Sequence, residues 1–182
     1  MVAGLLERLG IFMGHQLTPD REDSEFITHG GNFGIFTVRN DPLQASYLKR
    51  IAAVIAARNQ RHSVWGWKDP IAVFYLPAIV PLLRNPHYVF ITRDLGAVAQ
   101  REVAEAATPG GEPLLAQMRR ISMSNSMIVE FIAAARSPAL MISYERTLRR
   151  PEAVAKALLD FTGRKDSKFA EWSRDFIKPR KE

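Results

Sequence analysis

The stretch 87–101 constrains the fold more than any other part of the chain. Residues 87–92 are mainly aromatic and β-branched, which is typical of a short buried strand. Apolar residues then recur at helical spacing, so the strand passes into a helix. These helical positions are Leu95, Val98 and Ala99. Arg93 and Asp94 lie at the turn between strand and helix, which predicts a charged corner at the carboxyl end of a strand.

This corner has the composition of an anion site. In open α/β sheets, ligands bind at the carboxyl ends of the strands. An arginine such as Arg93 can form two parallel charge-assisted bonds to a phosphate. The start of the following helix adds free backbone N–H groups. The alternative interpretation is a surface pair of Arg93 with Asp94 that only closes the loop.

Two further short apolar runs, 63–67 and 139–144, also predict buried strands. Helical patterns separate the three runs, which indicates right-handed crossovers and a parallel sheet flanked by helices, an α/β class. The expected helices span 2–12, 42–59, 71–83, 95–107, 112–136 and 151–162, with a last one around Phe169, Trp172 and Phe176.

Several residues predict where these helices begin, bend and end. Gly10 either weakens the first helix or ends it, and Gly163 is suited to a C-cap. Asp41 and Pro42 predict the start of the helix that follows. Pro77 and Pro81 would kink or split the helix over 71–83. A short helix through Phe26 and Ile27 could be capped by Asp23 or Ser24. In the helix over 112–136, the candidate core positions are Leu115, Met118, Ile121, Ile128 and Ile132.

The composition is that of a globular protein. A chain of 182 residues with 47% hydrophobic residues can form a single domain, 1–182, with a helix and basic tail over 164–182. Cysteine is absent, which excludes disulfides and thiolate metal sites and is compatible with a reducing cytoplasm. No apolar run reaches the length of a membrane span. Glu7 and Arg8 interrupt the first apolar stretch, so it does not resemble a signal peptide.

The charge favours an anionic partner. The formal net charge is +6 and the isoelectric point is about 9.9. The basic residues are dispersed, apart from the tail at 178–181, so nucleic acid is not the favoured partner. His15, His62 and His87 show no metal-ligand spacing, and we expect no metal.

Ordered motifs across the chain resemble the sulfotransferase family of the P-loop superfamily, in particular its bacterial and carbohydrate-type members. Trp67-Lys68-Asp69-Pro70 is similar to the family's Lys-x-Pro element. The run 90–94 with Val98-Ala99 is similar to the strand–helix motif that holds the 3′-phosphate of the donor. Ser143-Tyr144-Glu145, Pro151-Glu152 and the run 159–163 are similar to the C-terminal elements, and Leu9-Gly10 with Gly14 to the end of the first helix. The resemblance implies a P-loop NTPase-like three-layer sandwich.

Two departures from the family pattern affect this interpretation. Family members open with a strand and a phosphate loop that cradles the 5′-phosphosulfate. Here Met1 to Gly4 correspond to the residues just after that loop, so we expect either a shorter, incomplete domain or a start upstream of Met1. The family also has a serine eight positions after the phosphate-binding arginine, where this chain has Arg101.

The resemblance implies transfer of a sulfuryl group from 3′-phosphoadenosine 5′-phosphosulfate (PAPS) to a hydroxyl or amine, with carbohydrates among the candidate acceptors. Arg93, helped by Arg101, would bind the 3′-phosphate. Tyr144 would lie near the adenine; the alternative is a core tyrosine with a satisfied hydroxyl. Lys68 would steady the leaving phosphate or an acidic acceptor; the alternative is a surface lysine paired with Asp69.

Glu22 is the candidate catalytic base, because it lies in the loop where carbohydrate-type members place their glutamate. Glu25 and His29 are second choices, and a purely solvated charged loop is the alternative. A different hypothesis is a truncated or degenerate member that acts as a binding or assembly module. The missing strand would leave apolar surface open, which favours oligomerisation. A nucleic-acid binder ranks last, since no recognition motif is present.

Overall fold

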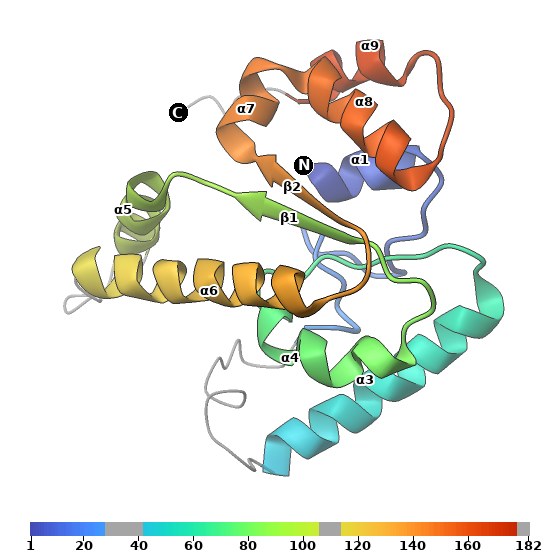
Figure 1. Ribbon diagram of the computed structural model, residues 1–182, viewed down its shortest axis with the longest axis vertical. Helices are drawn as coiled ribbons and strands as arrows, with labels where there is room; N and C mark the ends of the chain where they lie inside the picture. The colour runs from blue at the N-terminus through green and yellow to red at the C-terminus, as the bar shows by residue number, and fades with distance from the viewer. Residues whose placement is uncertain (28–41, 106–113, 178–182) are drawn as a thin grey trace. The chain divides into compact units, whose positions relative to one another are not determined.

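The computed structural model describes residues 1–27, 42–105 and 114–177. The described chain divides into two compact units, Met1–Pro86 and His87–Glu182. Figure 1 shows the helices and strands of both units with their labels. The expected mixture of helices with parallel strands is confirmed, so the fold is of the α/β class. Among the described residues, no helix combines the length and apolarity that crossing a membrane requires.

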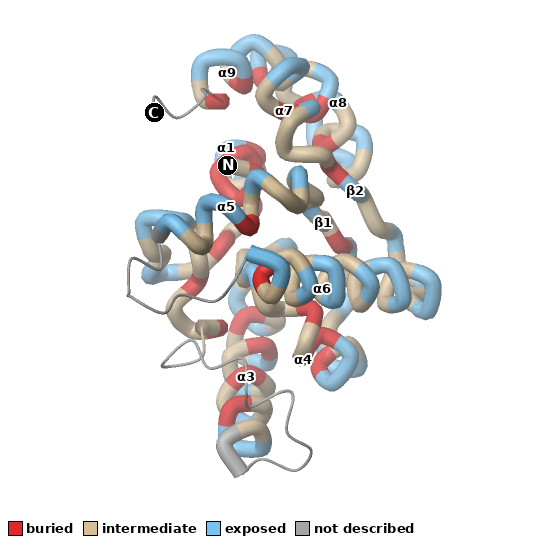
Figure 2. Tube along the Cα trace, turned by 90° about the vertical axis from the view of Figure 1, so that its left-hand side faces the viewer, coloured by how far each residue is buried: buried red, intermediate tan, exposed pale blue. Residues whose placement is uncertain are grey.

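The first unit is helical in the part that the structure describes. It contains α1 (Val2–Arg8), α3 (Pro42–Arg61), α4 (Ala72–Ile79) and the 3₁₀ turn η1 (Val80–Leu82). Its most deeply buried apolar side chains are Leu5, Phe26, Ile51, Ile55, Tyr75 and Ile79. The buried positions of α3 follow one side of the helix (Figure 2), as the 3.6-residue period requires.

The helix boundaries of this unit follow its glycines and prolines. α1 ends at Arg8, earlier than the expected residue 12, because Gly10 takes the left-handed conformation with φ +76°. α4 contains Pro77 and passes into η1 just before Pro81, so the predicted split is confirmed. The expected cap at Asp41 lies outside the described residues.

Two expectations for this unit are wrong. The run 63–67 forms no strand and makes a single parallel bridge, between Trp65 and Phe12. Residues 24–27 form a turn rather than a helix, although Oδ1 of Asp23 accepts from the amide of Glu25 at 3.1 Å, as a capping side chain does.

The second unit carries the sheet of the described chain, whose two strands are β1 (Tyr88–Thr92) and β2 (Ala139–Ser143). They pair in parallel, with Tyr88 opposite Ala139 and Thr92 opposite Ser143. The helices are α5 (Leu95–Glu105), α6 (Leu114–Ala134), α7 (Tyr144–Arg149), α8 (Pro151–Thr162) and α9 (Phe169–Phe176). α6 lies on one side of the strands, and α7, α8 and α9 lie on the other (Figure 1). The sheet is therefore flanked by helices on both sides.

Aromatic packing joins α6 to the sheet. The ring of Phe131 makes edge contacts with Tyr88 and Phe90, at centroid distances of 4.9 and 6.1 Å. Leu115, expected in the core, is 69% exposed, so that expectation is wrong. Gly163 ends α8 with φ +64°, which confirms the predicted C-cap.

Candidate functional site

The carboxyl ends of β1 and β2 bring Arg93 and Tyr144 together. The two strands pair in parallel, so their carboxyl ends meet at one edge of the sheet. The guanidinium carbon of Arg93 lies 4.0 Å from the centroid of the Tyr144 ring, a cation–π contact. Within the described chain, no guanidinium nitrogen of Arg93 has a hydrogen-bond partner, and Nε alone is buried. The two Nη groups therefore remain accessible to an anion.

Asp94 lies immediately before α5 and does not pair with Arg93. Its Oδ1 accepts a hydrogen bond of 2.7 Å from the amide of Ala97, which is the N-cap arrangement. Among the described ion pairs, none joins Asp94 to Arg93. The alternative of a surface pair that closes this loop is therefore wrong.

Glu145 links the two strand ends. Its Oε1 accepts from the amide of Asp94 at 2.9 Å, and its Oε2 accepts from the Ser143 hydroxyl at 3.0 Å. The hydrogen bond from Asp94 is the main reason that the pKa of Glu145 lies below its ordinary value, with Ser143 and the charge of Arg93 acting in the same direction. The carboxylate is therefore ionised at neutral pH beside Arg93.

The start of α5 also offers backbone donors. Within the described chain, the amides of Leu95 and Gly96 have no hydrogen-bond partner. Such amides at a helix start attract anions. Arg101 lies two turns further along α5, on the side of the helix that carries Asp94, and it is exposed. Arg93, Arg101 and Tyr144 thus all belong to the second unit.

Glu22 and Lys68 form an ion pair in the first unit. Nζ of Lys68 lies 2.5 Å from Oε1 of Glu22, and it also donates to the carbonyl of Asp20 at 3.3 Å. Both side chains are partly exposed, at 35% and 25%. Oε2 of Glu22 is neither buried nor hydrogen-bonded to a described residue. The alternative pairing of Lys68 with Asp69 is not formed, so that interpretation is wrong.

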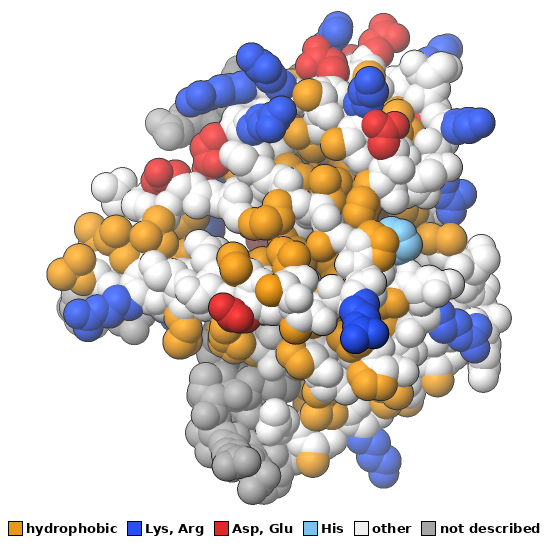
Figure 3. All heavy atoms as spheres, viewed as in Figure 1, with side chains coloured by type: hydrophobic (Ala, Val, Ile, Leu, Met, Phe, Trp, Pro, Cys, Tyr) orange, Lys and Arg blue, Asp and Glu red, His pale blue; other side chains and the backbone are white. Residues whose placement is uncertain are grey.

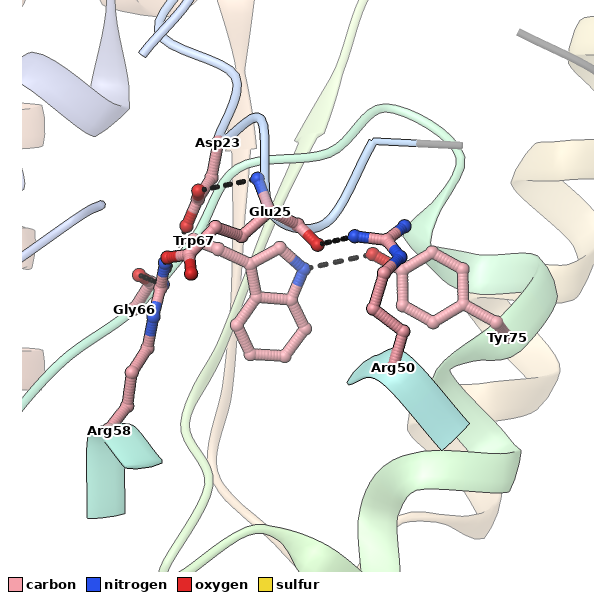
Figure 4. Close-up of polar contacts among 7 residues, drawn as sticks. All are labelled: Asp23, Glu25, Arg50, Arg58, Gly66, Trp67 and Tyr75. Carbon is pink, nitrogen blue, oxygen red and sulfur yellow. Dashed lines mark hydrogen bonds and ion pairs between the residues drawn. The ribbon is translucent and has the colours of Figure 1, made fainter. Parts of the chain in front are cut away.

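A buried arginine fixes the segment next to Glu22. Arg58 of α3 is 4% exposed, and its Nη1 lies 2.6 Å from Oδ2 of Asp23, which is fully buried. Its Nη2 also contacts the carboxylate of Glu25. Figure 4 shows Arg58 reaching from α3 toward Asp23 and the carbonyl of Gly66. The guanidinium faces three aromatic rings, those of Phe12, Phe26 and Trp65, at 5.1 to 5.5 Å from each centroid.

Main-chain hydrogen bonds connect the segment that Arg58 fixes to both candidate catalytic residues, Glu22 and Lys68. The amide of Asp23, next to Glu22, donates to the carbonyl of Lys68 at 3.4 Å. Arg50, also on α3, donates to the carbonyl of Glu25 (Figure 4). It also donates to the carbonyl of Ile27. Glu25, the second-choice base, is therefore engaged by two arginines. His29 lies outside the described residues.

Asp69, the neighbour of Lys68, faces the interior. Its Oδ2 accepts from the Tyr75 hydroxyl at 2.8 Å and its Oδ1 from the amide of Ile71 at 3.0 Å. The Trp67 indole in turn donates to the Tyr75 oxygen at 3.0 Å (Figure 4). Burial raises the pKa of Asp69 above its ordinary value, although both hydrogen bonds act in the opposite direction. These bonds orient the turn that carries Lys68.

Arg58 and Asp23 were not among the residues that the sequence singled out for the site. The available signal is an arginine on the apolar stripe of α3, in register with Tyr47, Ile51 and Ile55. A charge in such a stripe needs a buried partner. No group of His, Asp and Glu in the described part of the chain is arranged to hold a metal ion.

The fold and these residues define an α/β protein with an accessible arginine at the ends of parallel strands. The family model described as "Sulfotransferase family" matches residues 16–168, which is most of the chain. The chain therefore belongs to the sulfotransferase family, as the motif resemblance predicted. No curated protein matches it, and no solved structure does either.

Proposed function

We propose that this protein transfers a sulfuryl group from PAPS to a hydroxyl or amine acceptor, and that residues 1–182 act as one sulfotransferase-like domain. The observation that carries the proposal is the accessible guanidinium of Arg93, stacked on Tyr144 beside the unpartnered amides of Leu95 and Gly96. Family membership supports the reaction class. We also propose that this domain adopts the three-layer sandwich of the P-loop superfamily.

In this proposal the second unit holds the nucleotide. The Nη groups of Arg93 bind the 3′-phosphate by charge-assisted hydrogen bonds, and the amides at the start of α5 complete the site. Arg101 adds positive charge along the same side of α5. The Tyr144 ring, which the guanidinium of Arg93 contacts, lies near the adenine.

Glu22 and Lys68 supply the chemistry in this proposal. The acceptor oxygen or nitrogen forms a bond to sulfur, while the bond from sulfur to the oxygen of the 5′-phosphate breaks. Oε2 of Glu22, which is accessible, takes the acceptor proton. The ammonium of Lys68 stabilises negative charge that develops on the leaving phosphate. Before the reaction, the ion pair holds the side chains of Glu22 and Lys68 in place.

Calorimetry with 3′-phosphoadenosine 5′-phosphate tests the nucleotide site. We expect the wild type to bind and Arg93→Ala to bind at least about tenfold more weakly, since a hydrogen bond to a charged group contributes about 1.5–3 kcal/mol. Tyr144→Phe should bind like the wild type, and Tyr144→Leu more weakly. Arg136→Ala, which removes an exposed arginine two residues after α6, is the matched control.

Absence of binding by the wild type, or equal binding by the wild type and Arg93→Ala, would overturn the proposed nucleotide site. A transfer assay with labelled donor then separates an enzyme from the non-catalytic alternative. A protein that binds the nucleotide through Arg93 but transfers nothing to a panel of hydroxyl and amine acceptors would support a binding module.

A further inference from the structure

One side of α6 forms a continuous exposed stripe. Its positions alternate between spacings of four and three residues, the spacing that keeps successive side chains of a helix facing a partner helix. The opposite side of α6 is occupied, because Gln117 is buried and the Phe131 ring packs on the sheet. We call the exposed positions the α6 stripe: Leu115, Arg119, Ser122, Ser126, Val129 and Ala133.

Exposed hydrophobic side chains are concentrated on α6. Of the eight large hydrophobic side chains that are exposed in the described chain, four belong to this helix. Within the stripe, Leu115 is 69% exposed and Val129 is 55% exposed, and Met123 beside the stripe is 49% exposed. Figure 3 shows hydrophobic side chains at the surface over α6, together with side chains of both charges. Single apolar residues on a surface are common, but an aligned set on one helix indicates an interaction surface.

The order of residues along the stripe is complementary to itself. The six positions are symmetric about residue 124. Two copies of α6 packed antiparallel therefore bring Leu115 of each copy opposite Ala133 of the other, so that a large side chain meets a small one. Ser122 of each copy meets Ser126 of the other, and small side chains at the centre let two helix axes approach to about 8 Å. A two-fold interface requires self-complementarity of this kind.

The charges follow the same symmetry. Arg119 lies in the stripe and Glu130 follows Val129, and both charged residues are exposed. Neither charged side chain forms an ion pair or a hydrogen bond with a described residue. In the antiparallel arrangement, Arg119 of each copy faces Val129 of the other and lies beside its Glu130, which gives two ion pairs. A parallel arrangement would instead place Arg119 against Arg119, so the charges favour the antiparallel one.

We propose that two copies of this chain associate through α6, packed antiparallel about a two-fold axis near residue 124. The symmetry of the stripe selects this occupant, because a helix of an unrelated protein has no reason to match both its order of sizes and its order of charges. No residue of the stripe belongs to the proposed nucleotide site or to the pair of Glu22 with Lys68. The proposal therefore does not depend on the proposed function.

The dimer should be a weak one. The 21 residues of α6 make a helix about 30 Å long and about 10 Å wide. A contact of this size is smaller than the roughly 800 Å² that each partner buries in a standard interface. We therefore expect a Kd for dimerisation of about 1–100 μM.

Sedimentation velocity of the full chain between about 5 and 500 μM tests the dimer. The wild type should pass from monomer to dimer over this range. Arg119→Glu brings like charges together at both symmetric contacts and should raise the Kd at least about tenfold. Lys156→Glu makes the same change of charge at an exposed position on α8 and should leave the Kd within about twofold. A wild type that stays monomeric at the highest concentration, or equal losses in the two variants, would overturn the proposal.

A charge exchange tests the antiparallel arrangement. Glu130→Arg should raise the Kd as Arg119→Glu does, and Glu171→Arg, at an exposed position on α9, is its control. An equimolar mixture of Arg119→Glu with Glu130→Arg should dimerise like the wild type, because each arginine again lies beside a glutamate of the other copy. The variant that carries both changes in one chain should do the same.

A mixture that fails to recover dimerisation would contradict the antiparallel contact. Thermal unfolding of each variant shows that it is folded. Should a charge variant fail to fold, Ser126→Glu, which places an acidic side chain at the centre of the stripe in both copies, replaces it and should also weaken the dimer.

Nucleotide binding separates this proposal from the proposed function. Arg119→Glu should bind 3′-phosphoadenosine 5′-phosphate like the wild type, and Arg93→Ala should dimerise like the wild type. If no variant and no wild type binds the nucleotide while Arg119→Glu still loses the dimer, the proposed function fails and the α6 interface stands. If the nucleotide binds through Arg93 and the wild type is monomeric, the interface fails and the proposed nucleotide site stands.

Discussion

Nζ of Lys68 lies 2.5 Å from Oε1 of Glu22, although the two residues are 46 positions apart in the chain. The contact is supported on each side by a buried network. Arg58 holds the segment after Glu22 through Asp23, and Tyr75 holds the turn after Lys68 through Asp69. The pair is therefore placed by the interior of the first unit rather than by the flexibility of two surface side chains.

Replacing Glu22 tests its role as the base. We expect Glu22→Gln to lower kcat for sulfuryl transfer by about 100-fold or more, because general base catalysis contributes about 10²–10⁴-fold. The affinity for 3′-phosphoadenosine 5′-phosphate should stay within about twofold. Asp160→Asn, which changes an exposed carboxylate on α8, is the control and should leave kcat unchanged. Retention of full activity by Glu22→Gln would remove this residue from the chemistry.

The Arg58 cluster should contribute strongly to stability. Arg58→Met leaves the fully buried carboxylate of Asp23 without its cation, and breaking a buried pair in this way costs about 3–5 kcal/mol. Arg174→Met removes the exposed partner of Glu152 and should cost at most about 1 kcal/mol. Urea unfolding of both variants measures the difference. Similar losses in the two would show that the buried pair is not the main contribution.

Gly14 should not tolerate a side chain. Its φ of +134° is unfavourable for other residues, and a Cβ there would lie 2.7 Å from the carboxyl carbon of Asp23. Gly10 also has a positive φ, but a Cβ there would meet no atom within 4 Å. We expect Gly10→Ala to cost about 1–2 kcal/mol of unfolding free energy and Gly14→Ala clearly more. Thermal unfolding measures both variants. Gly10→Ala reports backbone strain alone, and Gly14→Ala reports backbone strain together with the clash against Asp23.

Stability should depend on pH through Glu145. The pKa of Glu145 in the folded protein lies below its ordinary value of 4.5, mainly because the amide of Asp94 donates to the carboxylate. Its contribution to stability is therefore complete above about pH 4.5 and is lost as the pH falls through the lower folded pKa. Between pH 6 and pH 3, Glu145→Gln should lose less unfolding free energy than the wild type. An equal loss, measured by urea unfolding, would contradict this.

Local patterns predicted most of the second unit. The run at 88–92 became β1, the run at 139–143 became β2, and the last two helices lie where Pro151, Gly163 and the aromatic spacing indicated. These features depend on neighbouring residues, which a sequence displays directly. α7 was missed, because its helix depends on Ser143 acting as an N-cap directly after a strand, and the hydroxyl accepts from the amide of Arg146.

Long-range contacts explain what the sequence did not predict in the first unit. Residues 63–67 have the composition of a strand, but Trp65 and Trp67 pack with Phe26 instead of joining a ladder. The alternative interpretation of Lys68 paired it with its neighbour Asp69, yet that carboxylate accepts from Tyr75, and Lys68 pairs with Glu22. The candidate residues could thus be chosen from motifs, whereas their partners depended on tertiary packing.

The Phe131 ring has a consequence for the stability of the strand pair. Two paired strands are only marginally stable by themselves, and Met141 and Ile91 of this sheet are 51% and 39% exposed. The edge contacts of Phe131 with Tyr88 and Phe90 fasten β1 to α6. An aromatic residue on a helix, remote in sequence from Arg93, thus helps to hold the strand that leads into this arginine.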